Sequence, residues 1–132
     1  MTISQVCSQY GLTPDTLRYY EKIGVIPEVH RTASGIRDYD EAAIGWVENA
    51  VCMRSAGVPV ESIIEYVRLY QAGDTTLQAR RDLLKDVHTS LLKQRQQMDA
   101  AIDRLSFKIR RYDVALKTGV LSWEEEDGQS ES

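Results

Sequence analysis

The sequence is poor in the features that mark membrane, secreted and disulfide-stabilised proteins. None of its apolar runs approaches the ~18 residues that a membrane span requires. Its N-terminal segment has neither the basic start nor the apolar stretch of a signal peptide. The two cysteines, Cys7 and Cys52, are too few for a disulfide scaffold and are compatible with a reducing compartment. These absences predict a cytoplasmic protein that has no membrane partner.

The chain also lacks the residue groupings that catalysis and metal binding require. It contains no recognisable pairing of a nucleophile with a base and no glycine-rich phosphate loop. His30 and His88 stand at no ligand spacing from either cysteine, and a metal site needs clustered ligands. An enzyme is therefore not expected, and neither is a resident metal or any other cofactor.

Overall basicity, a common mark of nucleic-acid binding, is missing as well, since the net charge is −4. Residues 1–74 hold 6 Lys+Arg and 10 Asp+Glu, whereas residues 75–118 hold 10 and 5. Residues 119–132 hold no Lys or Arg and 5 Asp+Glu. Any contact with nucleic acid must therefore depend on a local basic face and not on a basic domain.

Two short helices are predicted at the N-terminus. The first covers residues 2–10, where apolar side chains follow helical spacing. The second begins at Thr13, the N-cap, with Pro14 in the first helical position, and ends near Ile23 before a glycine. Two short helices joined by a tight, glycine-containing turn are the pattern of a helix-turn-helix.

A small β-hairpin, or wing, is predicted over residues 25–39. Pro27 breaks the preceding helix, and a Ser-Gly turn signal follows between extended pieces. Two further helices are predicted over residues 40–56 and 59–72. Together these elements form a head domain, residues 1–74.

Residues 75–118 contain neither proline nor glycine and are predicted to form one long helix with a coiled-coil seam. The second seam position is apolar only in the C-terminal half, because Arg81, His88 and Arg95 occupy it earlier. The residues at intervals of seven are Leu77, Leu84, Leu91, Met98, Leu105 and Tyr112, and the later second-seam residues are Ile102, Ile109 and Leu116.

A helix of this length needs a partner helix in water, which predicts dimerisation. The alternative, that the helix folds back on the head, is less favourable because so small a head cannot cover some forty residues. The last segment, residues 119–132, is acidic and polar, and it is predicted to be disordered.

The second helix is predicted to present a basic face. On a helical wheel, Glu21 lies within about 60° of Leu17, which can face the core. Arg18, Tyr19 and Lys22 cluster on the opposite side, between about 100° and 200°. Arginine binds guanine edges or phosphate, and lysine and tyrosine suit phosphate. For this helix alone, a plain solvated face is the alternative.

Two further elements present an arginine. Arg37 and Tyr39 lie at the end of the predicted wing, and Arg54 lies in the last turn of the third helix. For Arg54 a structural role is an alternative, because cations stabilise helix C-termini. Three separate elements thus favour a surface that binds DNA.

The sequence resembles the MerR family of transcription regulators over residues 1–118. The matching segments are TISQVCSQYGLTPDTLRYYEKIGVIP, SGIRDYDEAAIGWV and CMRSAGVPVESIIEYV, followed by the long helix. The resemblance implies a mainly α fold: a winged helix-turn-helix head, and one long C-terminal helix that forms an antiparallel coiled-coil homodimer. In that family the dimer binds double-stranded promoter DNA within an overlong spacer. The activated dimer distorts this DNA so that RNA polymerase engages both promoter elements.

Site residues follow from the resemblance by position. Arg18 and Tyr19 match recognition-helix contacts, Arg37 and Tyr39 match the first wing, and Arg54 matches the second. The complete predicted DNA-binding set is Thr16, Arg18, Tyr19, Lys22, Arg37, Tyr39 and Arg54.

The signal is predicted to be sensed at Cys52. It lies about 80° from Ile44 on the wheel of the third helix, at the edge of the apolar stripe. The short chain and the CMRSAGV segment resemble the aldehyde- and nitrosothiol-responsive branch of the family, in which a lone cysteine at this place is the proposed sensor. A thiolate activated by a cation such as Arg54 would add to an electrophile. A buried packing role is the alternative, and it is the role expected of Cys7.

Two other functions are weighed. A non-covalent ligand between head and long helix would be lined by Trp46, Tyr66 and Tyr70, although aromatic side chains there are more often core. A coiled-coil adaptor that does not bind DNA is the alternative of another class, and salt-dependent DNA binding would exclude it.

Overall fold

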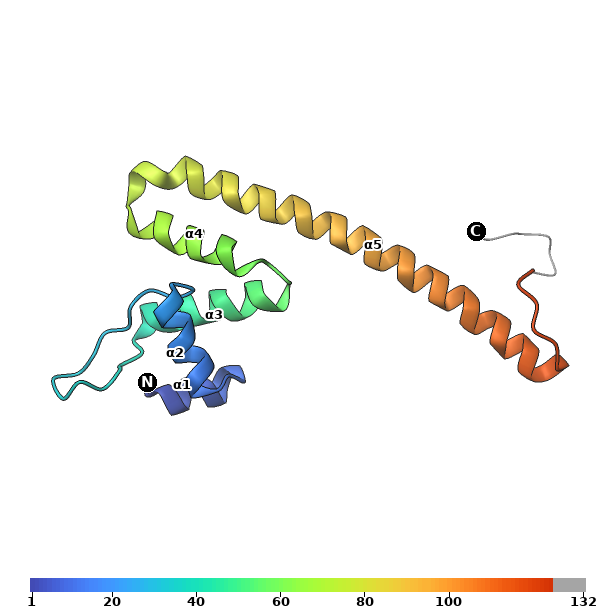
Figure 1. Cartoon of the computed structure of the whole chain (residues 1–132), viewed down its shortest axis with the longest axis horizontal. Coiled ribbons are helices and arrows are strands. Elements are labelled where there is room, and N and C mark those ends of the chain that lie inside the picture. The colour runs from blue at the N-terminus through green and yellow to red at the C-terminus, as the bar shows by residue number, and fades with distance from the viewer. Residues whose placement is uncertain (125–132) are drawn as a thin grey trace. The chain divides into compact units, whose positions relative to one another are not determined.

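The computed structural model describes residues 1–124 of the 132. Over this range the chain is helical, with no strand, and it divides into two compact units, one from Met1 to His88 and one from Thr89 onward. The disorder predicted for residues 119–132 falls partly on residues 125–132, which lie outside the described part, whereas residues 119–124 are described. The elements are α1 (Ile3–Tyr10), α2 (Pro14–Ile23), α3 (Glu41–Ser55), α4 (Val60–Gln71), the 3-10 turn η1 (Asp74–Thr76) and α5 (Leu77–Thr118) (Figure 1).

The first two helices begin and end where their capping residues predict. Thr2 and Gln5 form a reciprocal capping box at the start of α1, and the Thr13 side chain accepts a hydrogen bond from the Thr16 N–H at the start of α2. Gly11 and Gly24 end the two helices at φ of 68° and 89°, a left-handed conformation that strains other residues. The helix-turn-helix prediction is confirmed.

The core of the head is shared by all four of its α-helices and by the segments between them. Leu17 of α2, Val47 of α3 and Ile63 of α4 are fully buried. The extended residues after α2 contribute as much, since Val25 and Ile26 are 0% and 1% exposed. Burial of this apolar surface fixes α2 against the other helices of the head.

The wing is mostly a loop, and the predicted small β-hairpin is reduced to a turn with a single antiparallel bridge. Its tip carries one antiparallel bridge, between Arg31 and Arg37. Backbone bonds join Thr32 N–H to the Ile36 carbonyl at 2.7 Å and Gly35 N–H to the Thr32 carbonyl at 2.9 Å. The turn signal was therefore correct, but too few paired residues flank the turn to form a ladder. Figure 1 shows this loop extending from the head between α2 and α3.

The long helix predicted over residues 75–118 is confirmed as α5, which runs for 42 residues. Most of its predicted seam is exposed: Met98, Leu105 and Ile109 are 62%, 58% and 60% accessible. None of the helices over residues 1–124 is long and apolar enough to cross a membrane.

Candidate DNA-binding surface and sensor cysteine

The exposed face of α2 holds the predicted basic side chains. Arg18, Tyr19 and Lys22 are all accessible, and Tyr19 is 56% exposed although Leu17 beside it is fully buried. Thr16 lies one turn earlier, half-buried, and its hydroxyl accepts a hydrogen bond from the Thr13 hydroxyl at 2.8 Å. The face thus presents two cations and a phenol from a helix whose opposite side is anchored in the core.

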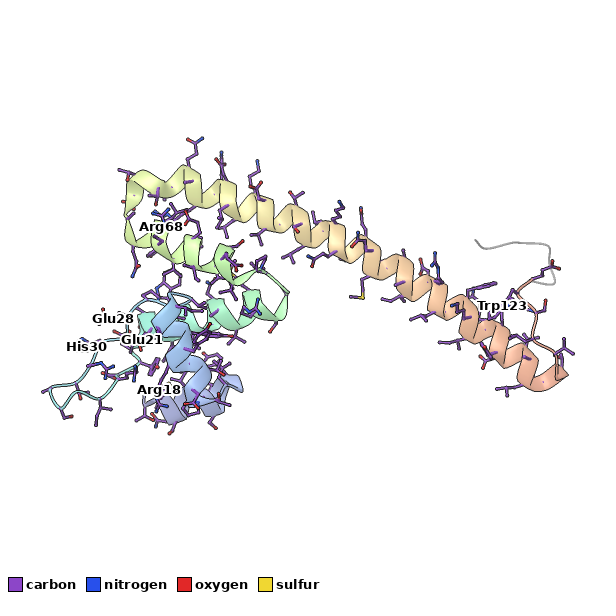
Figure 2. The ribbon with its side chains drawn as sticks, in the orientation of Figure 1. Arg18, Glu21, Glu28, His30, Arg68 and Trp123 are labelled. Atoms are coloured by element: carbon purple, nitrogen blue, oxygen red, sulfur yellow. The ribbon has the colours of Figure 1, made fainter. Side chains whose placement is uncertain are left out.

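Among the described residues, the one ion-pair partner of Arg18 is exposed. Its Nη1 lies 3.3 Å from Asp15 Oδ1, and the two side chains are 49% and 98% accessible. Exposed ion pairs of this kind contribute little to stability. The Arg18 guanidinium can therefore exchange Asp15 for a phosphate or a base edge at small cost. Figure 2 shows Arg18 on α2.

Arg37 is engaged within the head, and its contact with DNA stays a prediction. Its Nε donates to Glu21 Oε1 at 2.6 Å, and the side chains are 23% and 10% exposed. The other Glu21 oxygen accepts the Val29 N–H at 2.8 Å. The Glu21 carboxylate on α2, labelled in Figure 2, thus bonds to both ends of the wing loop, and Arg37 helps to hold the wing in position.

The electrostatics of Glu21 agree with this arrangement. Burial alone would raise the pKa of Glu21, but the Val29 N–H and the Arg37 guanidinium outweigh it, so the pKa lies below its ordinary value. Glu21 was not in the predicted site. One sequence feature could have identified Glu21: it lies on the core side of α2, within about 60° of Leu17, where an acidic side chain requires a partner.

Tyr39 does not belong to the exposed surface either. Its side chain is 0% exposed, and its hydroxyl finds no hydrogen-bond partner among the described residues. Burial, followed by the charge of Glu21, raises the pKa of the phenol. A direct side-chain contact with DNA is incompatible with this position, because Tyr39 is a core residue at the base of the wing.

Arg54 is exposed, and its guanidinium bonds to the backbone four residues further along the chain. Its Nη1 donates to the Val58 carbonyl at 2.8 Å, which ties the end of α3 to the loop before α4. Between residues 1 and 124 no hydrogen bond or ion pair links Arg54 to Cys52. In the structure Arg54 therefore caps the end of α3.

The two cysteines lie in opposite environments. Cys52 is exposed on α3, whereas Cys7 is 7% exposed in the core of the head. Burial raises the pKa of the Cys7 thiol, and the charge of Arg18 offsets part of that effect. A water-soluble electrophile therefore has access to Cys52 and not to Cys7. No group of residues in the described part of the chain could hold a metal ion.

The aromatic residues proposed to line a ligand pocket pack against one another, and Tyr70 stays 50% exposed. Trp46 packs edge-on against Tyr70, with ring centroids 5.0 Å apart, and against Tyr66 at 6.0 Å. Arg80 covers the Tyr70 ring from 4.9 Å.

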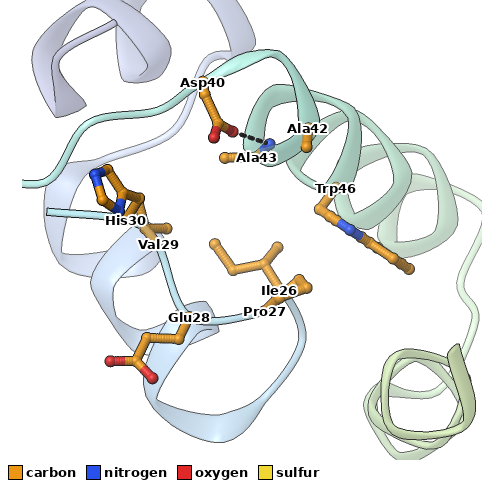
Figure 3. A pocket seen from close by; sticks show the side chains of 9 residues that line it. All are labelled: Ile26, Pro27, Glu28, Val29, His30, Asp40, Ala42, Ala43 and Trp46. Atoms are coloured by element: carbon orange, nitrogen blue, oxygen red, sulfur yellow. Dashed lines mark hydrogen bonds between the residues drawn. The ribbon is translucent and has the colours of Figure 1, made fainter. Parts of the chain in front are cut away.

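A separate cavity of about 190 Å³ is lined in part by Trp46 and lies between the segment after α2 and the start of α3 (Figure 3). Pockets for drug-sized ligands measure roughly 300–1,000 Å³. Its lining residues are Ile26, Pro27, Glu28, Val29, His30, Asp40, Ala42, Ala43 and Trp46. The volume favours solvent or a very small molecule.

Comparisons with known proteins agree with this geometry. The family profile described as MerR family regulatory protein matches residues 2–39. The HTH-type transcriptional regulator AdhR of Bacillus subtilis is 52% identical over 93 residues, which are 70% of this chain and 66% of AdhR.

Solved structures extend the likeness to α5. A protein from Listeria monocytogenes, described as a MerR family transcriptional regulator, is 39% identical with a TM-score of 0.85 over 90% of each chain. HiNmlR, a MerR family regulator lacking the sensor domain and solved bound to promoter DNA, is 24% identical. Its TM-score is 0.83 over 91% of this chain and 95% of its own, which shows a common fold. The helix-turn-helix head, the long α5 and the likeness to these relatives agree. The chain belongs to the MerR family of transcription regulators.

Proposed function

We propose that this regulator works as a homodimer that binds promoter DNA with an overlong spacer and activates transcription by distorting it, in the cytoplasm. The observation that carries the proposal is the exposed basic face of α2, where Arg18, Tyr19 and Lys22 stand out from a rigid helix-turn-helix. Such a face suits the major groove and its flanking phosphates. RNA polymerase would then engage both promoter elements on the distorted DNA.

Salt dependence of DNA binding tests this proposal. The full chain is expected to bind a fragment of its own promoter with an affinity that falls steeply, by at least tenfold, between about 50 and 200 mM salt, because phosphate contacts release counterions. Fluorescence anisotropy of a labelled duplex measures it, with a scrambled duplex of equal length as the control. Absence of any salt-dependent binding would instead favour the coiled-coil adaptor.

The homodimer is supported by the unpartnered face of α5. Six large apolar side chains recur on it at intervals of seven, and those of Leu77, Leu105 and Tyr112 are 60%, 58% and 53% exposed. Exposed apolar surface of this extent indicates an interaction site. A second copy running antiparallel would cover the face, because each apolar C-terminal half would then meet the half in which Arg81, His88 and Arg95 interrupt the seam.

We further propose that Cys52 is the sensor of reactive aldehydes or related electrophiles. The support is its exposure on α3, the burial of the other thiol, and the similarity to AdhR. Cys52 lies two residues before Arg54, whose bond to the Val58 carbonyl fixes the turn between α3 and α4. An adduct at Cys52 would therefore shift the end of α3 within the DNA-binding head.

The Cys52→Ser variant is expected to bind promoter DNA normally and to lose induction by aldehyde. With an α,β-unsaturated aldehyde, the Cys52 sulfur bonds to the β-carbon and a proton ends on the α-carbon, so wild type gains the full mass of the aldehyde. Mass spectrometry of peptides locates the adduct, and a promoter reporter measures induction. Cys7 serves as the internal control, since its burial predicts no adduct. Equal induction of variant and wild type would contradict the thiol proposal and favour a non-covalent ligand.

A further inference from the structure

The residues that follow α5 fold back onto its last turns. Gly119 N–H bonds to the Ala115 carbonyl at 2.7 Å, which ends the helix. Arg111 Nε then donates to the Ser122 carbonyl at 2.7 Å, and this bond leaves the Arg111 side chain 8% exposed. We call residues 119–124 the C-terminal hook. Its backbone is bonded to α5 at two points, Gly119 and Ser122.

The hook ends in an aromatic contact with the predicted seam. Trp123, labelled in Figure 2, stands edge-on to Tyr112 with ring centroids 5.9 Å apart. Tyr112 is a seam residue of α5. Even so, Val120, Leu121 and Trp123 remain 68%, 41% and 50% exposed. A short segment that is held in place but presents three large apolar side chains is suited to contact another surface.

The spacing of the seam indicates where that surface lies, on the basis of the proposed homodimer. In an antiparallel pair centred on Met98, the intervals of seven place Leu91 opposite Leu105 of the second copy and Leu84 opposite Tyr112. One interval further, Leu77 falls opposite position 119. The hook of each copy therefore meets the start of α5 in the other.

The start of α5 has a complementary surface. Leu77 is 60% exposed there, and together with Gln78 and Arg81 it lines a hollow of about 400 Å³. Among the described residues, Arg81 pairs with its neighbour Asp82, at 3.1 Å between two exposed side chains. The hook that would approach it carries the acidic Glu124 and no basic residue. Apolarity and charge thus match.

We propose that the C-terminal hook of each copy docks Trp123 against the Leu77–Arg81 hollow of a second copy and locks the ends of the coiled coil. Tryptophan is the side chain most suited to such an anchor, because it covers a large area with few rotatable bonds. The hook then couples the end of one α5 to the start of the other, directly after the partner's head.

Cysteine cross-linking of the full chain tests this contact. In a Cys52→Ser background, a variant with Leu77→Cys and Trp123→Cys is oxidised mildly with copper phenanthroline, which takes two electrons and two protons from the two thiols. A disulfide-linked dimer is expected on a non-reducing gel. The matched control combines Trp123→Cys with Leu92→Cys, which is 39% exposed and off the seam. Equal linking of the two variants would overturn the proposal.

Sedimentation equilibrium of wild type and of Trp123→Ala separates the hook from the homodimer. Wild type is expected to be a dimer, and Trp123→Ala to dissociate at least tenfold more readily, since two hooks are lost per dimer. Trp123→Phe is expected to recover most of the affinity. A wild-type dimer that Trp123→Ala leaves unchanged would overturn the hook alone. A wild-type monomer would overturn both the hook and the proposed homodimer.

Discussion

An Arg18→Ala variant of the full chain is expected to bind its promoter about 100-fold more weakly than wild type at the same salt concentration. A good arginine contact with a base edge or phosphate is worth at least ~1.4 kcal/mol, and a dimer uses two of them. The fold should survive the change, because Arg18 is half exposed and its pair with Asp15 is weak. Anisotropy titration of a labelled promoter duplex measures the affinity.

The matched control for this variant is Arg68→Ala. Arg68 is also an exposed helical arginine with an acidic partner three residues away, Glu65, but it lies on α4. Its removal should leave promoter affinity unchanged. The salt dependence of Arg18→Ala separates two modes of contact. A loss of about two from the log–log slope indicates phosphate, whereas an unchanged slope with relaxed specificity indicates a base edge. An affinity within twofold of wild type would exclude Arg18 from the interface.

The helices of the head could be predicted because their signals are local. Thr13 and Pro14 start α2, and a glycine ends it, whatever the rest of the chain does. The same is true of α5, because the absence of proline and glycine identifies its length and the apolar residues at intervals of seven identify the face that needs a partner. Such patterns are read within a few turns of helix.

The wing shows what local patterns cannot specify. Neighbouring residues of an extended segment point to opposite sides, so Arg37 and Tyr39 share a side, and the sequence does not say which side faces the core. The structure turns both toward Glu21 and the interior, leaving Tyr39 fully buried and Arg37 paired. Their interpretation as DNA contacts came from their place at the end of the wing and from the family resemblance, and it overlooked Glu21.

Cys52 illustrates an intermediate case. Helical spacing placed it at the edge of the apolar stripe of α3, where either burial or exposure was possible. The structure decides for exposure, because the core packs against the side of α3 that holds Val47 and Ala50. The sequence predicted that Cys52 lies at the edge of the apolar stripe. Whether the thiol is buried or exposed depended on how the other helices pack against α3.

A Glu21→Gln variant is expected to lose about 2 kcal/mol of the free energy of unfolding. Glu21 is 10% exposed and bonds at once to Arg37 and to the Val29 N–H, so its neutralisation leaves a half-buried guanidinium without its counter-charge. The wing should loosen, and promoter affinity should fall with it. Urea unfolding followed by circular dichroism measures the stability. Glu65→Gln is the matched control: it makes the same change in the exposed pair with Arg68, and it should have far less effect.

The dependence of this loss on pH identifies its cause. The pKa of Glu21 is lowered in the folded chain from an ordinary value of 4.5, so the ionised carboxylate stabilises the fold above that pH. As pH falls through the lower pKa of the folded state, the carboxylate is protonated and its contribution is lost. The stability difference between wild type and Glu21→Gln should therefore be constant near neutrality and shrink below about pH 4.5. If the stability difference persisted unchanged in acid, the lost charge would not be its cause. The altered geometry of the hydrogen bond from Val29 would then account for the difference.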